Sequence, residues 1–206
     1  MPRNPIRLVV RFVSHVLILS GVLLIADAGV TVAWQEPVSA LAAGHQQQEL
    51  EKSFEHPSKA VLRRKPLPGD AIGRIRLPAL HRSYYVVEGD DAKNLQKGPG
   101  HYPDTKLPGE GGTVGVAGHR TTHGAPFRTI DKLRKGDRIT MEMPYGTYVY
   151  RVQKTKIVDP TEVSVKRNVG YDRLILSACH PLYSAAQRIV VFARLESHRA
   201  ARVKKG

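Results

Sequence analysis

Cys179 and Arg188 are two residues whose types and positions could perform nucleophilic catalysis together. Cys179 is the single cysteine, so it cannot form an intramolecular disulfide. A lone cysteine is commonly a small buried hydrophobic residue, but this one follows the apolar run 173–178 and precedes His180 and Pro181. Because proline cannot continue a central strand, the thiol is expected at a strand end beside a loop. Arg188 opens the next β-prone run. Antiparallel pairing would therefore bring its positive charge, which favours a thiolate, to the same end.

A histidine occupies a similar place in another part of the chain. His119 follows the β-prone run 113–117 and Gly118, at the start of a loop. A histidine beside a thiol can stabilise the thiolate and later protonate a departing amine. His180 is the alternative, although it directly follows Cys179 and would point away from the thiol if the strand continues. We therefore predict that His119 is the catalytic histidine.

The elements that must position these residues are predicted to be short strands. Turn-forming residues separate several β-prone runs, and few of the runs have a helix between them. Residues 127–133 could form one or two helical turns. This pattern predicts an all-β barrel or sandwich. The runs are 72–77, 83–87, 113–117, 138–143, 147–152, 174–178 and 189–195.

The N-terminal region is typical of a membrane-targeted protein. Arginines in residues 1–11 form a basic flank, and residues 12–34 are apolar enough for a transmembrane anchor that ends near Trp34. The positive flank predicts a cytoplasmic N-terminus and an extracellular catalytic domain. An alternative is cleavage after Ala28, because Ala26 and Ala28 enclose Asp27 as in a signal-peptidase site. Both alternatives export the rest of the chain.

The rest of the chain divides into three predicted parts. Residues 35–70 resemble an extracellular stalk, with apolar positions too sparse for a packed helix, and are expected to be a solvated spacer. Residues 71–196 are the expected catalytic domain, and residues 197–206 are a basic tail expected to be mobile. The formal net charge of +14 favours acidic partners such as anionic lipid or wall polymer. Export argues against nucleic acid as a partner.

Several segments together resemble the bacterial sortases, in particular the class E sortases of high-GC Gram-positive bacteria. The similarity covers residues 72–195, and each motif alone is weak. The motifs are Leu95 with Gly98-Pro99-Gly100-His101-Tyr102-Pro103, the histidine segment Gly115 to Phe127, Leu133 with Gly136-Asp137, and Leu176 with Cys179-His180-Pro181 and Arg188.

The resemblance implies a closed sortase-type β-barrel of about eight short strands with one or two short helices and a groove at one end. It makes Cys179 the nucleophile, His119 the catalytic histidine and Arg188 the catalytic arginine. In that family the thiolate cleaves a C-terminal sorting signal resembling Leu-Pro-x-Thr-Gly after threonine. The acyl-enzyme then passes to an amine of the cell-wall precursor or to a pilin lysine. Class E resemblance favours Leu-Ala-x-Thr-Gly, and no cofactor is implied.

One position departs from the family pattern. The commonest strand in the family is Thr-Leu-x-Thr-Cys, whereas this chain has Ala178 before the cysteine. Ala178 lacks a hydroxyl that could contact substrate, and Ser177 would point to the opposite strand face from it. Together with His101 and His123, which could lie near the groove, Ala178 is a candidate substrate-binding residue.

Two rival functions fit less of the sequence. Cell-wall cross-linking transpeptidases carry their histidine close to the cysteine in one motif, whereas His119 lies far from Cys179 here. A basic membrane-tethered wall-binding module fits the charge, but it has no use for a free thiol beside an arginine. A single cysteine leaves too few soft ligands for a structural zinc site, so no metal is predicted. The expected partners are exported proteins with a sorting signal, an amine acceptor and the membrane.

Overall fold

The computed structural model describes residues 5–34 and 37–201, which divide into two compact units, Met1–Pro37 and Val38–Gly206. In the first unit, α1 (Pro5–Trp34) is one continuous helix. Its segment Ile6–Val30 is long and apolar enough to cross a membrane, judged by length and composition, and none of its most apolar part is buried. The helix therefore begins before the predicted anchor and includes part of the basic flank. Residues 1–4, 35–36 and 202–206 of the predicted flank, stalk and tail lie outside the described residues.

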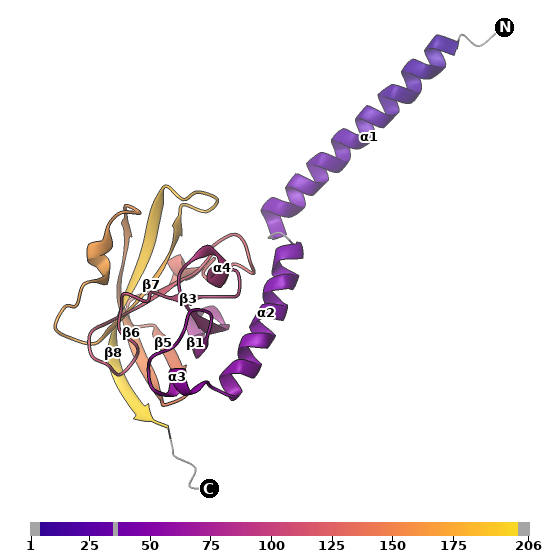
Figure 1. Ribbon diagram of the computed structural model, residues 1–206. Coiled ribbons are helices and arrows are strands. Elements are labelled where there is room, and N and C mark those ends of the chain that lie inside the picture. The colour runs from indigo at the N-terminus through magenta and orange to yellow at the C-terminus, as the bar shows by residue number, and fades with distance from the viewer. Residues whose placement is uncertain (1–4, 35–36, 202–206) are drawn as a thin grey trace. The chain divides into compact units, whose positions relative to one another are not determined.

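The second unit contains a closed β-barrel, which confirms the predicted fold (Figure 1). Its strand order is β1-β2-β3-β4-β7-β8-β6-β5, with β2/β3 and β4/β7 parallel and the other neighbouring pairs antiparallel. The strands are β1 (Ala71–Leu77), β2 (Arg82–Glu88), β3 (Gly100–His101), β4 (Thr113–Ala117), β5 (Arg138–Met143), β6 (Gly146–Val158), β7 (Arg173–His180) and β8 (Gln187–Ala200).

Alternation along β7 decides which residues fill the barrel. Leu174, Leu176 and Ala178 belong to the main hydrophobic core, whereas Ile175 packs with residues of β8 in a separate cluster. Successive side chains of a strand point to opposite faces. Cys179 therefore shares the face of Ile175, and its thiol lies on the outside of the barrel.

The strands at the C-terminal side are longer than the sequence predicted. β6 continues to Val158 and β8 to Ala200, because the two pair along almost their whole length. Ladder hydrogen bonds hold these polar ends in strands, although their composition alone favours a loop. Residues 197–200, placed in a mobile tail by the sequence, therefore belong to β8. The short strand β3 had no periodicity from which to predict it.

Short helices connect the strands. They are α3 (Lys59–Leu62), α4 (Ala92–Leu95) and the 3₁₀ helices η1 (Pro78–Leu80), η2 (Ile130–Lys132) and η3 (Val163–Lys166). η2 lies inside the helical turn that was predicted for residues 127–133. η3 belongs to the β6–β7 connection, which borders the groove described below.

Helix α2 (Pro37–Glu55) packs on the barrel, so the prediction of a solvated spacer is wrong for this segment. Leu50 is 5% exposed and forms a small hydrophobic cluster with Ala71 and Val87. The Gln47 amide donates to the carbonyls of Tyr85 (3.0 Å) and Lys97 (2.9 Å). Its oxygen accepts from the Tyr85 N–H at 2.7 Å. A few well-placed contacts therefore replace the continuous apolar stripe that the sequence lacks.

Candidate functional site

A groove of about 370 Å³ lies where β4 and β7 end and where β8 begins. His119, Cys179 and Arg188 all line it. These residues come from different parts of the chain, and the barrel topology brings them together because β7 pairs with β4 on one side and with β8 on the other. The sequence prediction that they share one end of the sheet therefore agrees with their positions.

Cys179 and Arg188 are direct partners in the antiparallel ladder of β7 and β8. The thiol is free and half-buried. One guanidinium nitrogen of Arg188 donates to the backbone carbonyls of Ala185 and Gln187, each at 3.0 Å. No carboxylate among the described residues forms an ion pair with Arg188. Its positive charge is therefore available to an anion in the groove.

Backbone contacts fix the start of the His119 loop. The Gly118 N–H donates to the Ser177 carbonyl at 3.0 Å, and the Phe127 N–H donates to the His119 carbonyl at the same distance. A Cβ on Gly118 would lie 2.5 Å from the Phe127 ring, so only glycine fits here. The loop is thus tied directly to the strand that carries the cysteine.

The ring of His119 lies against that of His123, with the ring centroids 4.9 Å apart and the ring planes tilted by 30°. Burial lowers the pKa of His119 below its ordinary value, and the charge of His123 lowers this pKa further. The neutral imidazole is therefore the main form of His119 near neutral pH. A neutral imidazole can accept a proton from a thiol or from an incoming amine.

His123 is not among the residues that line the groove, although its ring lies beside that of His119, which does line it. Its contact with substrate stays a prediction. Its backbone has a positive φ of 51°, and its N–H donates to the Ser39 hydroxyl of α2 at 3.3 Å. Its Nδ1 is buried without a hydrogen-bond partner among the described residues. Since the ring lies against His119, its position suits an influence on that histidine.

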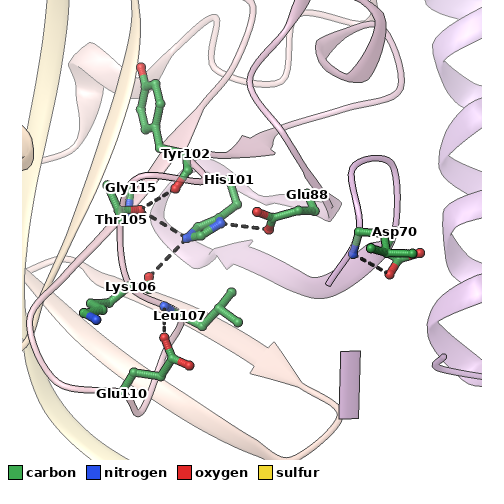
Figure 2. Close-up of polar contacts among 10 residues, drawn as sticks. Asp70, Glu88, His101, Tyr102, Thr105, Lys106, Leu107, Glu110 and Gly115 are labelled. Carbon is green, nitrogen blue, oxygen red and sulfur yellow. Dashed lines mark hydrogen bonds and ion pairs between the residues drawn. The ribbon is translucent and has the colours of Figure 1, made fainter. Parts of the chain in front are cut away.

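His101 is 2% exposed and is not among the residues that line the groove. Figure 2 shows its ring between the Glu88 carboxylate, with Nδ1 2.8 Å from Oε2, and the Lys106 carbonyl, 3.1 Å from Nε2. The hydroxyl of Thr105 also lies 3.1 Å from Nε2. These partners hold the ring in the barrel wall, and the next residue, Tyr102, borders the groove instead.

Ala178 borders the groove, and its side chain belongs to the interior core and is 4% exposed. A threonine at this position would direct its side chain toward the barrel interior. Contact of Ala178 with substrate stays a prediction. Ser177 is the residue that shares the face of Cys179. Its hydroxyl lies 2.8 Å from that of Tyr102, and both residues line the groove. The spacing of two residues from the cysteine could have identified Ser177 from the sequence.

His180, the alternative catalytic histidine, does not line the groove. Its Nδ1 lies 3.3 Å from Nη1 of Arg120, a buried arginine that the sequence prediction missed. Arginine has donors alone, so Nδ1 of His180 accepts this hydrogen bond. This position favours His119 as the histidine that could serve a reacting group in the groove.

Apolar residues form one wall of the groove, on β7, β8 and the β6–β7 connection. Among them, Ile175 and Val190 are buried, whereas Val163 of η3 is 64% exposed. An exposed apolar side chain at the rim of a groove can bury the apolar side chain of a bound peptide. The site thus combines a free thiol, a histidine, an apolar wall and a guanidinium that has no carboxylate partner among the described residues.

Comparisons with known proteins agree with this arrangement. The family model described as "Sortase domain" matches residues 75–196. Sortase D of Bacillus subtilis is 36% identical over 134 residues, which are 63% of this chain and 66% of that protein. Sortase SrtE1 of Streptomyces coelicolor is 33% identical over 148 residues, which are 64% of this chain and 42% of that protein. The chain thus spans less than two thirds of these curated relatives.

The solved structure of sortase E from Streptomyces avermitilis superposes with a TM-score of 0.62 at 29% identity. The superposition covers 68% of this chain and 97% of that one.

Proposed function

Because this chain belongs to the sortase family, whose homologues are cysteine transpeptidases, we propose that it is a membrane-anchored cysteine transpeptidase. Its substrates are exported proteins that carry a C-terminal sorting signal. The observation that supports this best is the groove in which His119 joins Cys179 and its ladder partner Arg188. The proposed topology has a cytoplasmic N-terminus, α1 in the membrane and residues 71–200 outside, with α2 packed on the barrel.

In the proposed acylation step, the Cys179 thiolate attacks the carbonyl carbon of the threonine in the sorting signal. The C–N bond then breaks, and the imidazolium of His119 donates its proton to the departing amine of the next residue. The product is a thioester between Cys179 and the threonine. Arg188 stabilises the oxyanion by charge-assisted hydrogen bonds, for which its guanidinium has no competing carboxylate among the described residues.

In the proposed transfer step, the amine of a cell-wall precursor attacks the thioester carbonyl. Neutral His119 accepts the proton of this amine, the new amide forms, and Cys179 leaves as a thiolate. The lowered pKa of His119 suits this step, because the neutral ring is its main form near neutral pH. A pilin lysine is the alternative acceptor, since it offers the same primary amine.

The proposed sorting signal is of the Leu-Pro-x-Thr-Gly or Leu-Ala-x-Thr-Gly type. The apolar wall around Val163 and Ile175 supports an apolar residue a few positions before the threonine. The resemblance to class E sortases, and the 33% identity with the Streptomyces coelicolor relative, favour alanine at the second position.

The experiment uses the full chain in detergent with quenched fluorescent peptides of both types and a small amine acceptor. We expect cleavage after threonine and an amine-capped product, both absent in Cys179→Ala. Replacement of His119 by Ala or of Arg188 by Ala should each lower kcat by at least ~10²-fold. A folded wild-type chain that cleaves neither peptide, or that cleaves one as fast without the thiol, contradicts the proposal.

A further inference from the structure

Arg120 is almost fully buried, which is rare for an arginine. It is 3% exposed, whereas its ion-pair partner Asp131, 2.9 Å away, is 46% exposed. Burying a guanidinium is costly unless its donors are paired. The proposed mechanism does not use this residue, and a leucine or methionine could fill the same volume without that cost. The burial therefore needs a reason other than packing.

The two edges of the Arg120 guanidinium contact different segments. On one edge, Nε and Nη2 donate to the carbonyl of Arg128 at 3.3 and 3.1 Å, and Nη2 also reaches Asp131 at 2.9 Å. These partners follow the histidine loop. On the other edge, Nη1 donates to Nδ1 of His180 at 3.3 Å and makes a long contact of 3.5 Å with the carbonyl of Cys179.

Arg120 therefore connects the two halves of the proposed catalytic site. It directly follows His119 in the chain, and it contacts the backbone of Cys179 itself. The side chain of Arg120 thus reaches from the His119 loop to the backbone carbonyl of Cys179. The β4/β7 pairing ends at Ala117 and Ser177, so the Gly118–Ser177 hydrogen bond and Arg120 continue the connection beyond the ladder.

We propose that Arg120 is a positioning residue that holds the His119 loop against the end of β7, so that histidine and thiol keep the separation that proton transfer needs. This inference rests on the proposed function. Lysine cannot replace arginine here, because an ammonium is a compact point charge without the planar fork that serves both edges. Misplacement of catalytic groups by about 1 Å can cost on the order of 10²-fold in rate.

The test compares Arg120→Lys and Arg120→Ala with the wild-type full chain in detergent, by peptide cleavage per folded molecule. We expect kcat to fall about 10- to 100-fold in both variants, with KM changed less than about threefold. The matched control is Arg74→Lys, since Arg74 also pairs with a carboxylate, Glu142 at 2.7 Å, but lies on β1 away from the groove. Its kcat should stay at the wild-type value.

A second readout separates positioning from a general loss of stability. If Arg120 holds the loop, its loss lets water reach His119, and the pKa of His119 rises toward its ordinary value in an NMR titration of the Arg120→Ala protein. Unchanged kcat per folded molecule together with an unchanged His119 titration, whatever the melting temperature, would overturn the inference. Should the wild-type chain not cleave peptide, the proposed function fails, and the NMR comparison still decides whether Arg120 holds the histidine.

Discussion

Cys179 and Arg188 lie on the same strand face because they occupy opposite positions in one antiparallel ladder. Two adjacent strands place both residues at the groove, so their positions do not depend on the conformation of a loop. His119 differs, because a loop carries it, and it depends on Gly118, Phe127 and Arg120 for its place. Substitutions near His119 should therefore change the rate by shifting the position or the protonation of its ring. Substitutions of Cys179 or Arg188 should instead remove a group that takes part in the proposed reaction.

The first prediction concerns the protonation of His119. Burial is the first cause of its lowered pKa and the charge of His123 is the second. His123→Phe keeps an aromatic ring beside His119 but removes that charge, so the pKa of His119 should rise while it stays below its ordinary value. More imidazolium is then present near neutral pH, and the imidazolium-dependent limb of the pH–rate profile should move to higher pH.

NMR titration of His119 and the pH dependence of kcat/KM measure this change. His45→Gln on the exposed side of α2 serves as the control and should leave both unchanged. A His119 titration that does not move in His123→Phe contradicts the assigned influence of His123.

The second prediction concerns the buried pair of Glu88 and His101. The Lys106 carbonyl can only accept, so Nε2 of His101 donates to it, and Nδ1 of His101 is hydrogen bonded to the Glu88 carboxylate. Glu88→Ala leaves Nδ1 of His101 buried without its partner and should lower the free energy of unfolding by about 3–5 kcal/mol. Glu88→Gln should cost less, because its amide can still hydrogen bond to the ring.

Denaturant unfolding measures these costs. Because His101 does not line the groove, kcat per folded molecule should be the same in both Glu88 variants and in the wild type. A selective rise in KM without a loss of stability would instead return His101 to the substrate-contact role that the sequence suggested.

At the scale of elements, α2 is the segment whose role differs most from its sequence pattern. It contacts β2 through Gln47 and Leu50, and it also reaches the histidine loop. The Ser39 hydroxyl accepts from the His123 N–H at 3.3 Å, and Ala43 is 6% exposed. A Cβ placed on Gly124 would lie 3.1 Å from that of Ala43. The helix therefore packs with the barrel and with the loop that carries His119.

The third prediction compares two leucines of this helix. Leu50 is 5% exposed and Leu41 is 78% exposed, so they form a matched pair. Leu50→Ala should lower the free energy of unfolding by about 2–5 kcal/mol, since it removes buried methyl groups and leaves a cavity. Leu41→Ala should change it by less than about 0.5 kcal/mol. Equal effects in chemical denaturation would mean that α2 does not pack on the barrel in solution.

At the scale of the whole molecule, barrel closure removes the open strand edges that would otherwise pair with another chain. The second unit, Val38–Gly206, has its own hydrophobic core. None of the most apolar part of the helix in the first unit is buried. The proposed membrane attachment and the proposed catalysis thus belong to different units.

The fourth prediction follows from this separation. A fragment of residues 38–206 should stay in solution, melt at the same temperature as the full chain and cleave peptide with an unchanged kcat. The full chain should sediment with membranes. The net charge of +14 could also attach it to anionic lipid, so a high-salt wash is the control, because salt screens such attraction and leaves an inserted helix in place. Release of the full chain by salt would contradict an anchor in α1.

Much of this protein could be predicted from its sequence, because the information is local. Alternation and turns predicted the barrel strands, and the proline after Cys179 predicted a strand end. Cys179 lies near the end of one β-prone run and Arg188 opens the next, which predicted that the two residues pair across adjacent antiparallel strands. Each of these inferences depends on residues close together in the chain, for which strand geometry and turn chemistry decide the outcome.

Only the tertiary structure decided the rest, because it depends on partners distant in sequence. It placed His101 in the barrel wall beside Glu88, turned Ala178 inward and Ser177 toward the groove, and packed α2 on the barrel. It also buried Arg120 against Cys179. Whether a polar side chain faces a groove or a buried partner depends on which distant segments of the folded chain pack next to it. No pattern of spacing along the sequence carries that information.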